Sequence, residues 1–242
     1  MQPKNLSLIL PPHVAVIMDG NNRWAKKENL PGIAGHQKGV QRAREAVEFA
    51  VEKNLKTLTL FAFSSENWGR TDDEVNLLMK LLAHALEEQV PNLIENKVQL
   101  SFIGDLLKFD EDLRKKMEKA EKLTVCDKEK NLDLVIAVSY GGRWDIVEAA
   151  KKIRDLNKDI EINEELVNSF TSLSSFSDPD LCIRTGGDFR VSNFLLWHLA
   201  YTELYFSDKF WPDFDCNQFQ LALDEYSRRQ RRFGNKSNFE VT

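Results

Sequence analysis

Short, continuously apolar runs alternate with longer amphipathic segments along the whole chain, and this alternation constrains the fold most. The apolar runs have strand length and lack the alternating polar pattern of a sheet with one solvated face, so helices must cover both faces. We therefore predict an α/β fold with a largely parallel central sheet of about six strands flanked by helices. The expected strands are Val14 to Met18, Leu58 to Phe63, Val98 to Ile103, Leu132 to Val138, Leu181 to Ile183 and Leu204 to Phe206.

The amphipathic segments between these strands carry apolar residues at helical spacing. The sequence has neither an internal repeat nor a low-complexity linker, and its 242 residues suffice for one large core. We therefore predict a single domain covering residues 1–242. The expected helices are Val40 to Glu52, Asp72 to Ile94, Glu111 to Leu123, Trp144 to Leu156, Asn193 to Tyr201 and Cys216 to Arg232.

The composition disfavours several classes of protein. A formal net charge of −5 argues against a nucleic-acid-binding protein, so any anion site is expected to be local. Cys126, Cys182 and Cys216 stand far apart, which predicts buried thiols in a reducing compartment and neither disulfides nor a zinc site. No apolar run approaches the roughly 18 residues of a membrane span, and the first residues lack the apolar core of a signal peptide. We therefore expect a cytoplasmic protein.

The first loop after a predicted strand carries a carboxylate, flexible residues and a guanidinium between Asp19 and Trp24. Asp19 suits a hard cation, while Arg23 and the amides around Gly20 suit phosphate oxygens. The alternative is an ordinary turn in which Asp19 caps the next helix, and Arg23 with Trp24 favours the phosphate site. Neither a dinucleotide-binding glycine motif nor a P-loop motif occurs in the sequence, which disfavours those nucleotide sites.

The second loop, Ser64 to Arg70, precedes Thr71, which is a good helix N-cap with Glu74 at the capping-box position. That local role does not explain Asn67 or Arg70, which suit an anionic substrate. After the fifth predicted strand, the segment from Arg184 to Asn193 places two arginines, a glycine pair and a hydroxyl before a predicted helix. Guanidinium groups and helix-start amides favour phosphate, so we predict a second anion site there.

Several motifs in fixed order carry a resemblance to a known family. They are Met-Asp-Gly-Asn-x-Arg-Trp, Gly-His, Phe-Ser-x-Glu-Asn-Trp-x-Arg, Tyr-Gly-Gly-Arg, Ile-Arg-Thr-Gly-Gly and Trp-Pro-Asp-Phe. With these motifs the chain resembles the cis-prenyltransferase family of the undecaprenyl diphosphate synthase type, over a core of about residues 13–234. The resemblance implies a Mg²⁺-dependent enzyme that adds isopentenyl diphosphate repeatedly to an allylic diphosphate such as farnesyl diphosphate. The product would be a long-chain Z-polyprenyl diphosphate, with undecaprenyl diphosphate, the lipid carrier precursor for cell-wall synthesis, as the family default.

The resemblance also implies roles for individual residues. Asp19 would bind Mg²⁺ with Glu203 as a second carboxylate, although a lone glutamate is more often a solvated or capping residue. The isopentenyl diphosphate site would contain Arg184, Arg190 and Ser192, while Ser64, Asn67 and Arg70 would orient substrates and assist proton removal. The allylic diphosphate would contact Gly20, Asn21, Arg23, Trp24 and His36.

The hydrocarbon of the product needs an apolar tunnel, and two predicted helices supply candidate walls. A buried core helix explains the same apolar stripes, so both interpretations apply. The family further implies a homodimer in which Arg232 reaches the partner's site, and peripheral membrane contact for product release. The predicted tunnel residues are Val47, Ala50, Leu78, Met79, Leu82 and Leu86.

Some positions depart from frequent family patterns. Asn22 and Gly32 stand where glycine and arginine are common, which leaves one diphosphate contact open, while Ser139 and Asp188 replace asparagine and glutamate. The proton acceptor is either a diphosphate oxygen or a relay through Asn67 and Ser64. Two rival functions are a non-catalytic accessory subunit and a haloacid-dehalogenase-type phosphatase. The phosphatase would need a second Asp two positions after the first, where this chain has asparagine.

Overall fold

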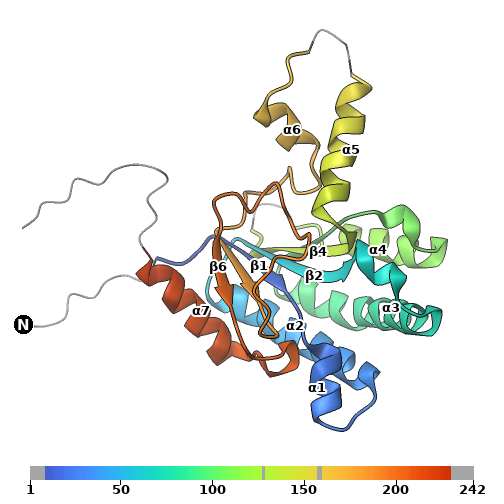
Figure 1. Ribbon diagram of the computed structural model, residues 1–242, viewed down its shortest axis with the longest axis vertical. Helices are drawn as coiled ribbons and strands as arrows, with labels where there is room; N and C mark the ends of the chain where they lie inside the picture. Colours follow the sequence, from blue (N-terminus) through green and yellow to red (C-terminus); the bar gives the residue numbers. More distant parts are fainter. Residues whose placement is uncertain (1–8, 127–128, 157–159, 230–242) are drawn as a thin grey trace, which may run out of the picture.

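A computed structural model describes residues 9–126, 129–156 and 160–229. Its centre is a six-stranded sheet in the order β3-β4-β2-β1-β5-β6, and every pair of neighbouring strands is parallel (Figure 1). This confirms the predicted fold class. The strands are β1 His13–Ile17, β2 Thr57–Ser64, β3 Val98–Ile103, β4 Leu132–Tyr140, β5 Leu181–Arg184 and β6 Glu203–Phe206.

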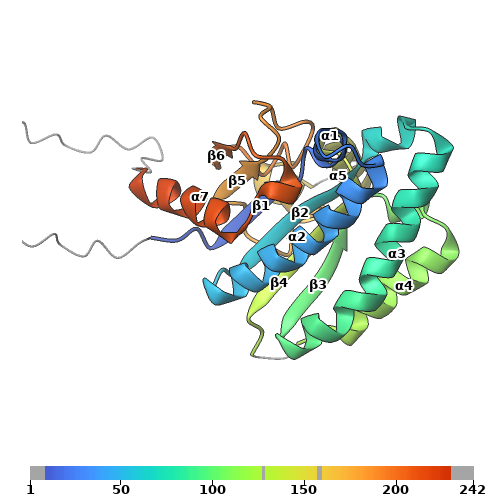
Figure 2. The same ribbon diagram turned by 90° about the horizontal axis from the view of Figure 1, so that it is seen from below.

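Both faces of this sheet are covered, as continuously apolar strands require, one by helices and the other largely by the turns around Leu173, Phe194 and Leu195. Helices α2 and α3 lie on the same face (Figure 2), whereas α5 and α6 project from the other side of the body (Figure 1). Short 3-10 helices at Ser65–Gly69, Leu106–Lys108 and Trp211–Asp213 complete the connections. The α-helices are α1 Asn21–Lys27, α2 Gly32–Glu52, α3 Asp72–Glu95, α4 Glu111–Leu123, α5 Gly142–Arg154, α6 Glu164–Phe170 and α7 Cys216–Arg228.

Side chains of β1 divide between two apolar cores, one on each face of the sheet. Val14 and Val16 pack into the larger core beneath α2, α3, α4 and α7, while Ala15 and Ile17 pack into the smaller one. The smaller core is closed by Phe194, which stacks on Phe61 of β2 with ring centroids 4.3 Å apart. A strand that is buried on both faces fixes the position of whatever follows it.

The strand register brings three predicted site loops to one edge of the sheet. Ile17 at the end of β1 pairs with Phe61 of β2 and with Arg184 of β5. Because the strands are parallel, their carboxyl ends lie together, and so do the loops that leave them. Asp19, Ser64 and Arg184 therefore belong to one site.

The prediction of a helix from Asn193 to Tyr201 is wrong, because this segment forms a series of turns. Ser192, Asn193 and Leu195 adopt positive φ angles of 46°, 61° and 40°, which right-handed helices exclude. The apolar residues that suggested a helix are there for another reason, since Phe194 and Leu195 are fully buried in the smaller core. The anion site after β5 consequently has no helix start behind it.

Other boundaries also differ from expectation. The predicted phosphate loop after β1 turns into helix α1 at Asn21, α2 begins earlier than expected at Gly32, and α6 was not predicted. Helix α7 ends at Arg228, earlier than the predicted Arg232, because Arg229 has an extended backbone; residues 230–232 lie outside the described residues. None of the helices within the described ranges is both long and apolar enough to cross a membrane.

The three cysteines are free thiols, but only one of them is buried as predicted. Cys182 lies in β5, where burial raises the pKa of its thiol to about 12. Cys126 and Cys216 are partly exposed. The expectation that all three are core residues is therefore wrong for two of them.

Candidate active site

A polar pocket of about 570 Å³ opens at the carboxyl edge of the sheet, where the loops after β1, β2 and β5 meet. We call it the polar pocket. Among the residues that line it are most of the side chains that the sequence singled out: Asp19, Gly20, Asn21, Arg23, His36, Ser64, Asn67, Arg70, Arg184 and Ser192.

Arg184 is the centre of this pocket and is nearly buried, with 4% of its side chain exposed. Its Nη2 lies 2.7 Å from Oδ2 of Asp19, and its Nη1 donates to the Ser192 hydroxyl at 2.6 Å and to the Arg190 carbonyl at 2.5 Å. A guanidinium held by three acceptors cannot rotate freely, so the charge is fixed in place. The ion pair joins the loop after β1 to the loop after β5.

A second group of charges lies at the rim around Asp188. Its carboxylate is 3.2 Å from Arg23, 3.1 Å from Arg190 and 3.7 Å from Arg184. Burial alone would raise the pKa of Asp188, but Arg190, Arg23 and Arg184 outweigh it and lower that pKa below its usual value. Three arginines therefore converge on one carboxylate, an arrangement that also suits a multiply charged phosphate.

The turn between β1 and α1 requires glycine at position 20. Gly20 has φ of 109°, and a Cβ there would lie 2.7 Å from the ring of Phe210. Arg23 lies across that same ring, 5.4 Å from its centroid. Trp24, predicted to contact substrate, instead donates to Asp213 at 2.8 Å and is absent from the described lining of the pocket. Its role is to hold α1 against the segment before α7.

The loop after β2 begins with a reciprocal cap. The Ser64 amide donates to Oδ1 of Asn67 at 2.9 Å, and the Ser64 side chain accepts from the Asn67 amide. Further along, Arg70 pairs with Glu74 at 2.7 Å, and Asn22 donates to the same carboxylate. Asn67 thus has a local structural role as well as a place in the pocket wall.

His36 lies where the polar pocket meets an apolar cavity, because it lines both. Burial, together with the nearby Arg70, lowers the pKa of His36 to about 4. Its Nε2 has no hydrogen-bond partner within the described part of the chain. His36 is therefore a neutral imidazole near pH 7, with one polar atom available to a ligand.

Glu203, predicted to share a metal with Asp19, lies at the other end of the sheet. It is the first residue of β6 and pairs in register with Leu181, the first residue of β5. Asp19 lies two residues after Ile17, which pairs with Arg184 at the last residue of β5. Its carboxylate accepts instead from Arg229 at 3.0 Å. The two carboxylates therefore do not meet within one chain, because parallel strands place their first and last residues at opposite edges, and a metal-binding role for Glu203 stays a prediction.

An apolar cavity of about 210 Å³ lies between α2, α3 and the sheet. Five of the six predicted tunnel residues line it, namely Val47, Leu78, Met79, Leu82 and Leu86. Ala50 is not among its described lining, since it is fully buried in the larger core. The cavity contains the side chains that we predicted for a hydrocarbon.

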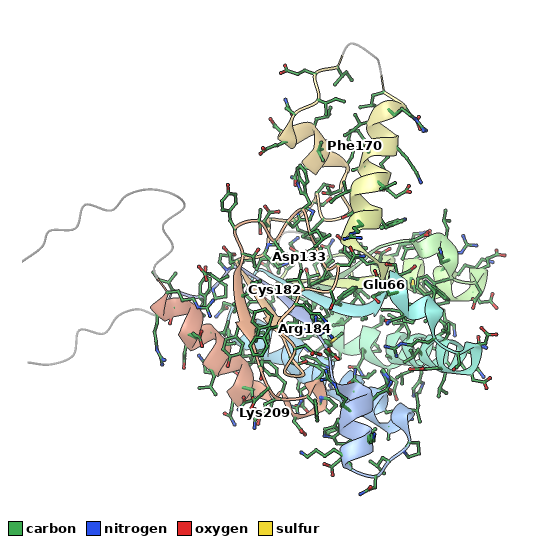
Figure 3. The ribbon with its side chains drawn as sticks, viewed as in Figure 1. Glu66, Asp133, Phe170, Cys182, Arg184 and Lys209 are labelled. Atoms are coloured by element: carbon green, nitrogen blue, oxygen red, sulfur yellow. The ribbon has the colours of Figure 1, made fainter. Side chains whose placement is uncertain are left out.

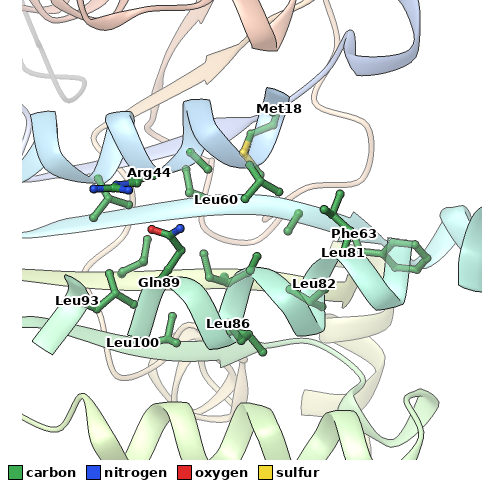
Figure 4. A pocket seen from close by; sticks show the side chains of 18 of the residues that line it. Met18, Arg44, Leu60, Phe63, Leu81, Leu82, Leu86, Gln89, Leu93 and Leu100 are labelled. Carbon is green, nitrogen blue, oxygen red and sulfur yellow. The ribbon is translucent and has the colours of Figure 1, made fainter. Parts of the chain in front are cut away.

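The two ends of this cavity differ in polarity. Figure 4 shows Met18 and Phe63 toward one end and Arg44 with Gln89 toward the other. At the polar end Arg44 pairs with Glu48 at 2.9 Å, and Asn92 of α3 donates to the same carboxylate at 3.2 Å. These bonds join α2 to α3 and close the cavity with polar groups.

Among the polar residues of the pocket wall that sequence reasoning did not assign to the site are Glu66 and Asn193. Asn193 donates to Glu66 at 2.7 Å, across the mouth between the loops after β2 and β5. Figure 3 shows Glu66 and Arg184 near the centre of the molecule. The available signal was position, because Glu66 lies inside the Phe-Ser-x-Glu-Asn motif and Asn193 directly follows Ser192.

Curated proteins that are similar to this chain include a polyprenyl diphosphate synthase and an isoprenyl transferase. A ditrans,polycis-undecaprenyl-diphosphate synthase described as farnesyl-diphosphate specific, from Photorhabdus laumondii subsp. laumondii, is 48% identical over 235 residues, 95% of this chain and 92% of the relative. An isoprenyl transferase of Aquifex pyrophilus is 51% identical over 229 residues, covering 95% and 98% of the two chains.

Solved structures agree with these relatives. Lavandulyl diphosphate synthase from Lavandula x intermedia, in complex with dimethylallyl diphosphate, superposes with a TM-score of 0.89 at 36% identity, over 93% of this chain and 99% of that one. A probable undecaprenyl diphosphate synthase from Campylobacter jejuni gives 0.78 at 36% identity with the same coverage. A family model described as putative undecaprenyl diphosphate synthase matches residues 17–234, and the chain therefore belongs to this prenyltransferase family.

Proposed function

We propose that this protein is a cis-prenyltransferase that condenses isopentenyl diphosphate repeatedly onto an allylic diphosphate. One observation carries the proposal: a polar pocket lined by Arg23, Arg70 and Arg184 adjoins an apolar cavity, with which it shares part of its wall. A prenyl diphosphate has this same division into a charged head and an apolar tail. The residues that line both spaces are Met18, Asn21, His36, Phe61, Ala62 and Leu78.

Farnesyl diphosphate is the proposed primer and undecaprenyl diphosphate the proposed product. Support for both comes from the relatives, several of which are described as ditrans,polycis-undecaprenyl-diphosphate synthases that are farnesyl-diphosphate specific. Arg23, Gly20, Asn21 and His36 would hold the allylic diphosphate at the junction with the cavity. Arg184, Arg190 and Ser192 would hold isopentenyl diphosphate.

Mg²⁺ fits the donors of the polar pocket. Asp19 is partly exposed there, and the described residues contain no cluster of three or more His, Cys, Asp or Glu side chains that would bind a metal by themselves. Mg²⁺ is typically held by one or two carboxylates together with substrate phosphates and water. When bound at Asp19, the ion would neutralise charge on the departing diphosphate.

The residues of the chain have three tasks in this reaction. Arg23, Arg184 and Arg190 stabilise diphosphate charge that grows as the allylic carbon–oxygen bond breaks. The pocket aligns the two substrates, and the apolar cavity keeps water from the carbocation-like carbon. The proton lost from isopentenyl diphosphate passes to a diphosphate oxygen or to a relay through Asn67 and Ser64, whose side chains are each held by the other's backbone amide.

We also propose a homodimer, for which the β6 edge is the supporting surface. No described strand pairs with the outer edge of β6, and Phe189, with 79% of its surface exposed, packs against Phe206 of this strand. A free edge with exposed aromatic side chains suits pairing with a second copy. Arg232, predicted to reach the partner's site, lies outside the described residues. We place the enzyme in the cytoplasm, with peripheral membrane contact at product release.

The test is to incubate the purified chain with farnesyl and isopentenyl diphosphates, with Mg²⁺ or with a chelator, and to size the products. Mg²⁺-dependent elongation by the chain alone is expected. A chain that elongates only when a second protein is added would be an accessory subunit instead. Absence of Mg²⁺-dependent products under both conditions would refute the proposal.

A further inference from the structure

Three loops meet on one side of the polar pocket, at a site that the proposed reaction does not use. We call this site the three-loop junction and define it by Ser65, Glu66, Gly141, Arg143 and Asn193. These residues lie in the segments that follow the carboxyl ends of β2, β4 and β5. Glu66 and Asn193 also line the polar pocket, so the junction belongs to its wall.

Asn193 makes the contacts that hold the junction together. Its side-chain oxygen accepts from the Arg143 amide at 2.9 Å, its side-chain nitrogen donates to Glu66 at 2.7 Å, and its carbonyl accepts from the Gly142 amide at 2.6 Å. One asparagine therefore connects the loop that carries it to the two others.

The close approach of the loops depends on glycine at position 141. A Cβ there would lie 2.4 Å from the Ser65 hydroxyl and 2.7 Å from the Asn193 side-chain nitrogen. Gly141 itself has an extended backbone, so it is required for space and not for an unusual φ angle. The chain thus leaves room for Ser65 and Asn193 to approach the backbone of Gly141.

The backbone at Asn193 is strained, and Glu66 is placed to hold it. Ser192 and Asn193 are consecutive residues other than glycine with positive φ angles, a conformation that persists only when surrounding contacts enforce it. Ser192 presents its hydroxyl to Arg184 at 2.6 Å. A chain of contacts therefore runs from Glu66 through Asn193 and Ser192 to Arg184.

A carboxylate in the wall of a diphosphate pocket opposes substrate charge, so Glu66 needs another reason to lie there. Burial alone would raise the pKa of Glu66, but hydrogen bonds from Asn193 and from its own neighbours lower it. Glu66 is thus an ionised acceptor already engaged by Asn193 and by the Ser65 hydroxyl at 3.1 Å. It is placed to act on the anion site through Asn193 rather than on the substrate.

We propose that Glu66 is a positioning residue for the anion site around Arg184: it holds Asn193, and thereby Ser192, in the conformation that binds isopentenyl diphosphate. The inference rests on the proposed function only for the identity of this ligand. Glu66 itself does not touch the reacting atoms.

The test measures binding of isopentenyl diphosphate and of inorganic pyrophosphate by calorimetry without allylic primer, so that no turnover occurs. Glu66→Ala is expected to weaken binding of both about tenfold, because the hydrogen bond that fixes Asn193 is lost. Glu66→Gln retains an acceptor and should stay within about threefold of the native chain. Glu87→Ala is the matched control and should bind as the native chain does, because it removes an exposed carboxylate of α3 that pairs with Lys116 of α4.

A double-mutant cycle with Asn193→Ala separates positioning from general damage. If the two residues act through one contact, the double variant should be no weaker than the weaker single variant. In steady-state assays Glu66→Ala should raise KM for isopentenyl diphosphate more than it lowers kcat, with KM for the allylic substrate little changed.

Three results would overturn the inference: binding by Glu66→Ala within twofold of native, multiplicative effects in the cycle, or equal losses in Glu66→Gln and Glu66→Ala. A native chain that binds both anions but makes no product would refute the proposed function, while the role of Glu66 would still be decided by the binding data. A native chain that binds neither anion would refute both.

Discussion

The polar pocket and the apolar cavity adjoin each other but are built by different parts of the chain. Strand ends, the loops that follow them and the start of α1 supply most of the pocket, and its charges already pair with one another, as Arg184 does with Asp19 and Arg23 with Asp188. Helices α2 and α3 supply most of the cavity wall, which consists mainly of uncharged apolar side chains. Recognition of the head therefore depends on a few fixed charges, whereas recognition of the tail is spread over many apolar contacts.

The largest expected effect of a single substitution is at Asp19. Asp19→Ala should reduce turnover by about 10³-fold or more, because the variant lacks the carboxylate that would hold Mg²⁺ against the departing diphosphate. The fold should persist, since Arg184 keeps its bonds to Ser192 and to the Arg190 carbonyl. Incorporation of labelled isopentenyl diphosphate measures the first effect and thermal melting the second. Turnover within tenfold of native would show that Asp19 does not bind the metal.

Arg190→Ala should have a smaller effect that is confined to one substrate. Arg190 is mostly exposed and pairs with Asp188, so its loss should leave stability unchanged. A charged hydrogen bond of about 1.5–3 kcal/mol corresponds to a rise of roughly 10- to 150-fold in KM for isopentenyl diphosphate. Steady-state kinetics with each substrate varied in turn provide the measurement, with the exposed Arg154→Ala as control. An equal rise in KM for the allylic substrate would contradict the assignment.

In the cavity, substitution should change product length more than rate. Leu82→Trp adds bulk to the wall, so products should become shorter by several isoprene units while the first condensation continues. Ile94→Trp, on the exposed side of the same helix, is the control and should leave product length unchanged. Chromatographic sizing of radiolabelled products distinguishes the two. Full-length product from Leu82→Trp would place the hydrocarbon elsewhere.

Substitution of His36, which lines both the polar pocket and the apolar cavity, should have the smallest effect, and it should appear in the pH dependence of stability. Its pKa is about 4 in the folded protein against 6.5 as the ordinary value, so the unfolded chain binds more protons between these limits. Its contribution to stability is therefore complete above about pH 6.5 and is lost as the pH falls toward 4. Urea titrations between pH 7 and 4.5 should show a shallower pH dependence for His36→Gln than for the native chain.

His13 has the same folded-state pKa of about 4, so the native decline contains contributions from both histidines. Only the difference between the native chain and His36→Gln isolates His36. Identical slopes would mean that folding does not lower the pKa of His36.

How much the sequence could predict differs between the two spaces. Continuous apolar runs and motif order were sufficient for the strands and for the loops that meet at Asp19 and Arg184. The positive φ angles at Ser192 and Asn193 could not be predicted, because the apolar run behind them has a helix-like composition. The separation of Glu203 from Asp19 could not be predicted either, because motif order says nothing of which end of a parallel strand a residue occupies.

For the cavity, periodicity identified apolar faces but not depth. Val47 and Ala50 both fall on the apolar side of α2, yet only Val47 lines the cavity. The polar end at Arg44 and Glu48 was also missed, since charged residues on a helix are ordinarily assigned to solvent. Which side chains face an internal space depends on how α2 and α3 approach each other, and that is a tertiary property.

The strand order has a consequence for how this protein is made. Strand β1 lies between β2 and β5 in the sheet. Asp19 can form its ion pair only after Arg184, 165 positions later in the chain, has been synthesised. At ribosomal rates of roughly 5–20 residues per second, about ten to thirty seconds separate the emergence of the two residues. During that time one edge of β1, an apolar strand, has no neighbour to pair with. Nascent chains of this protein are therefore expected to need protection from aggregation until β5 emerges at the start of the last quarter of the sequence, and the active site is completed only after that.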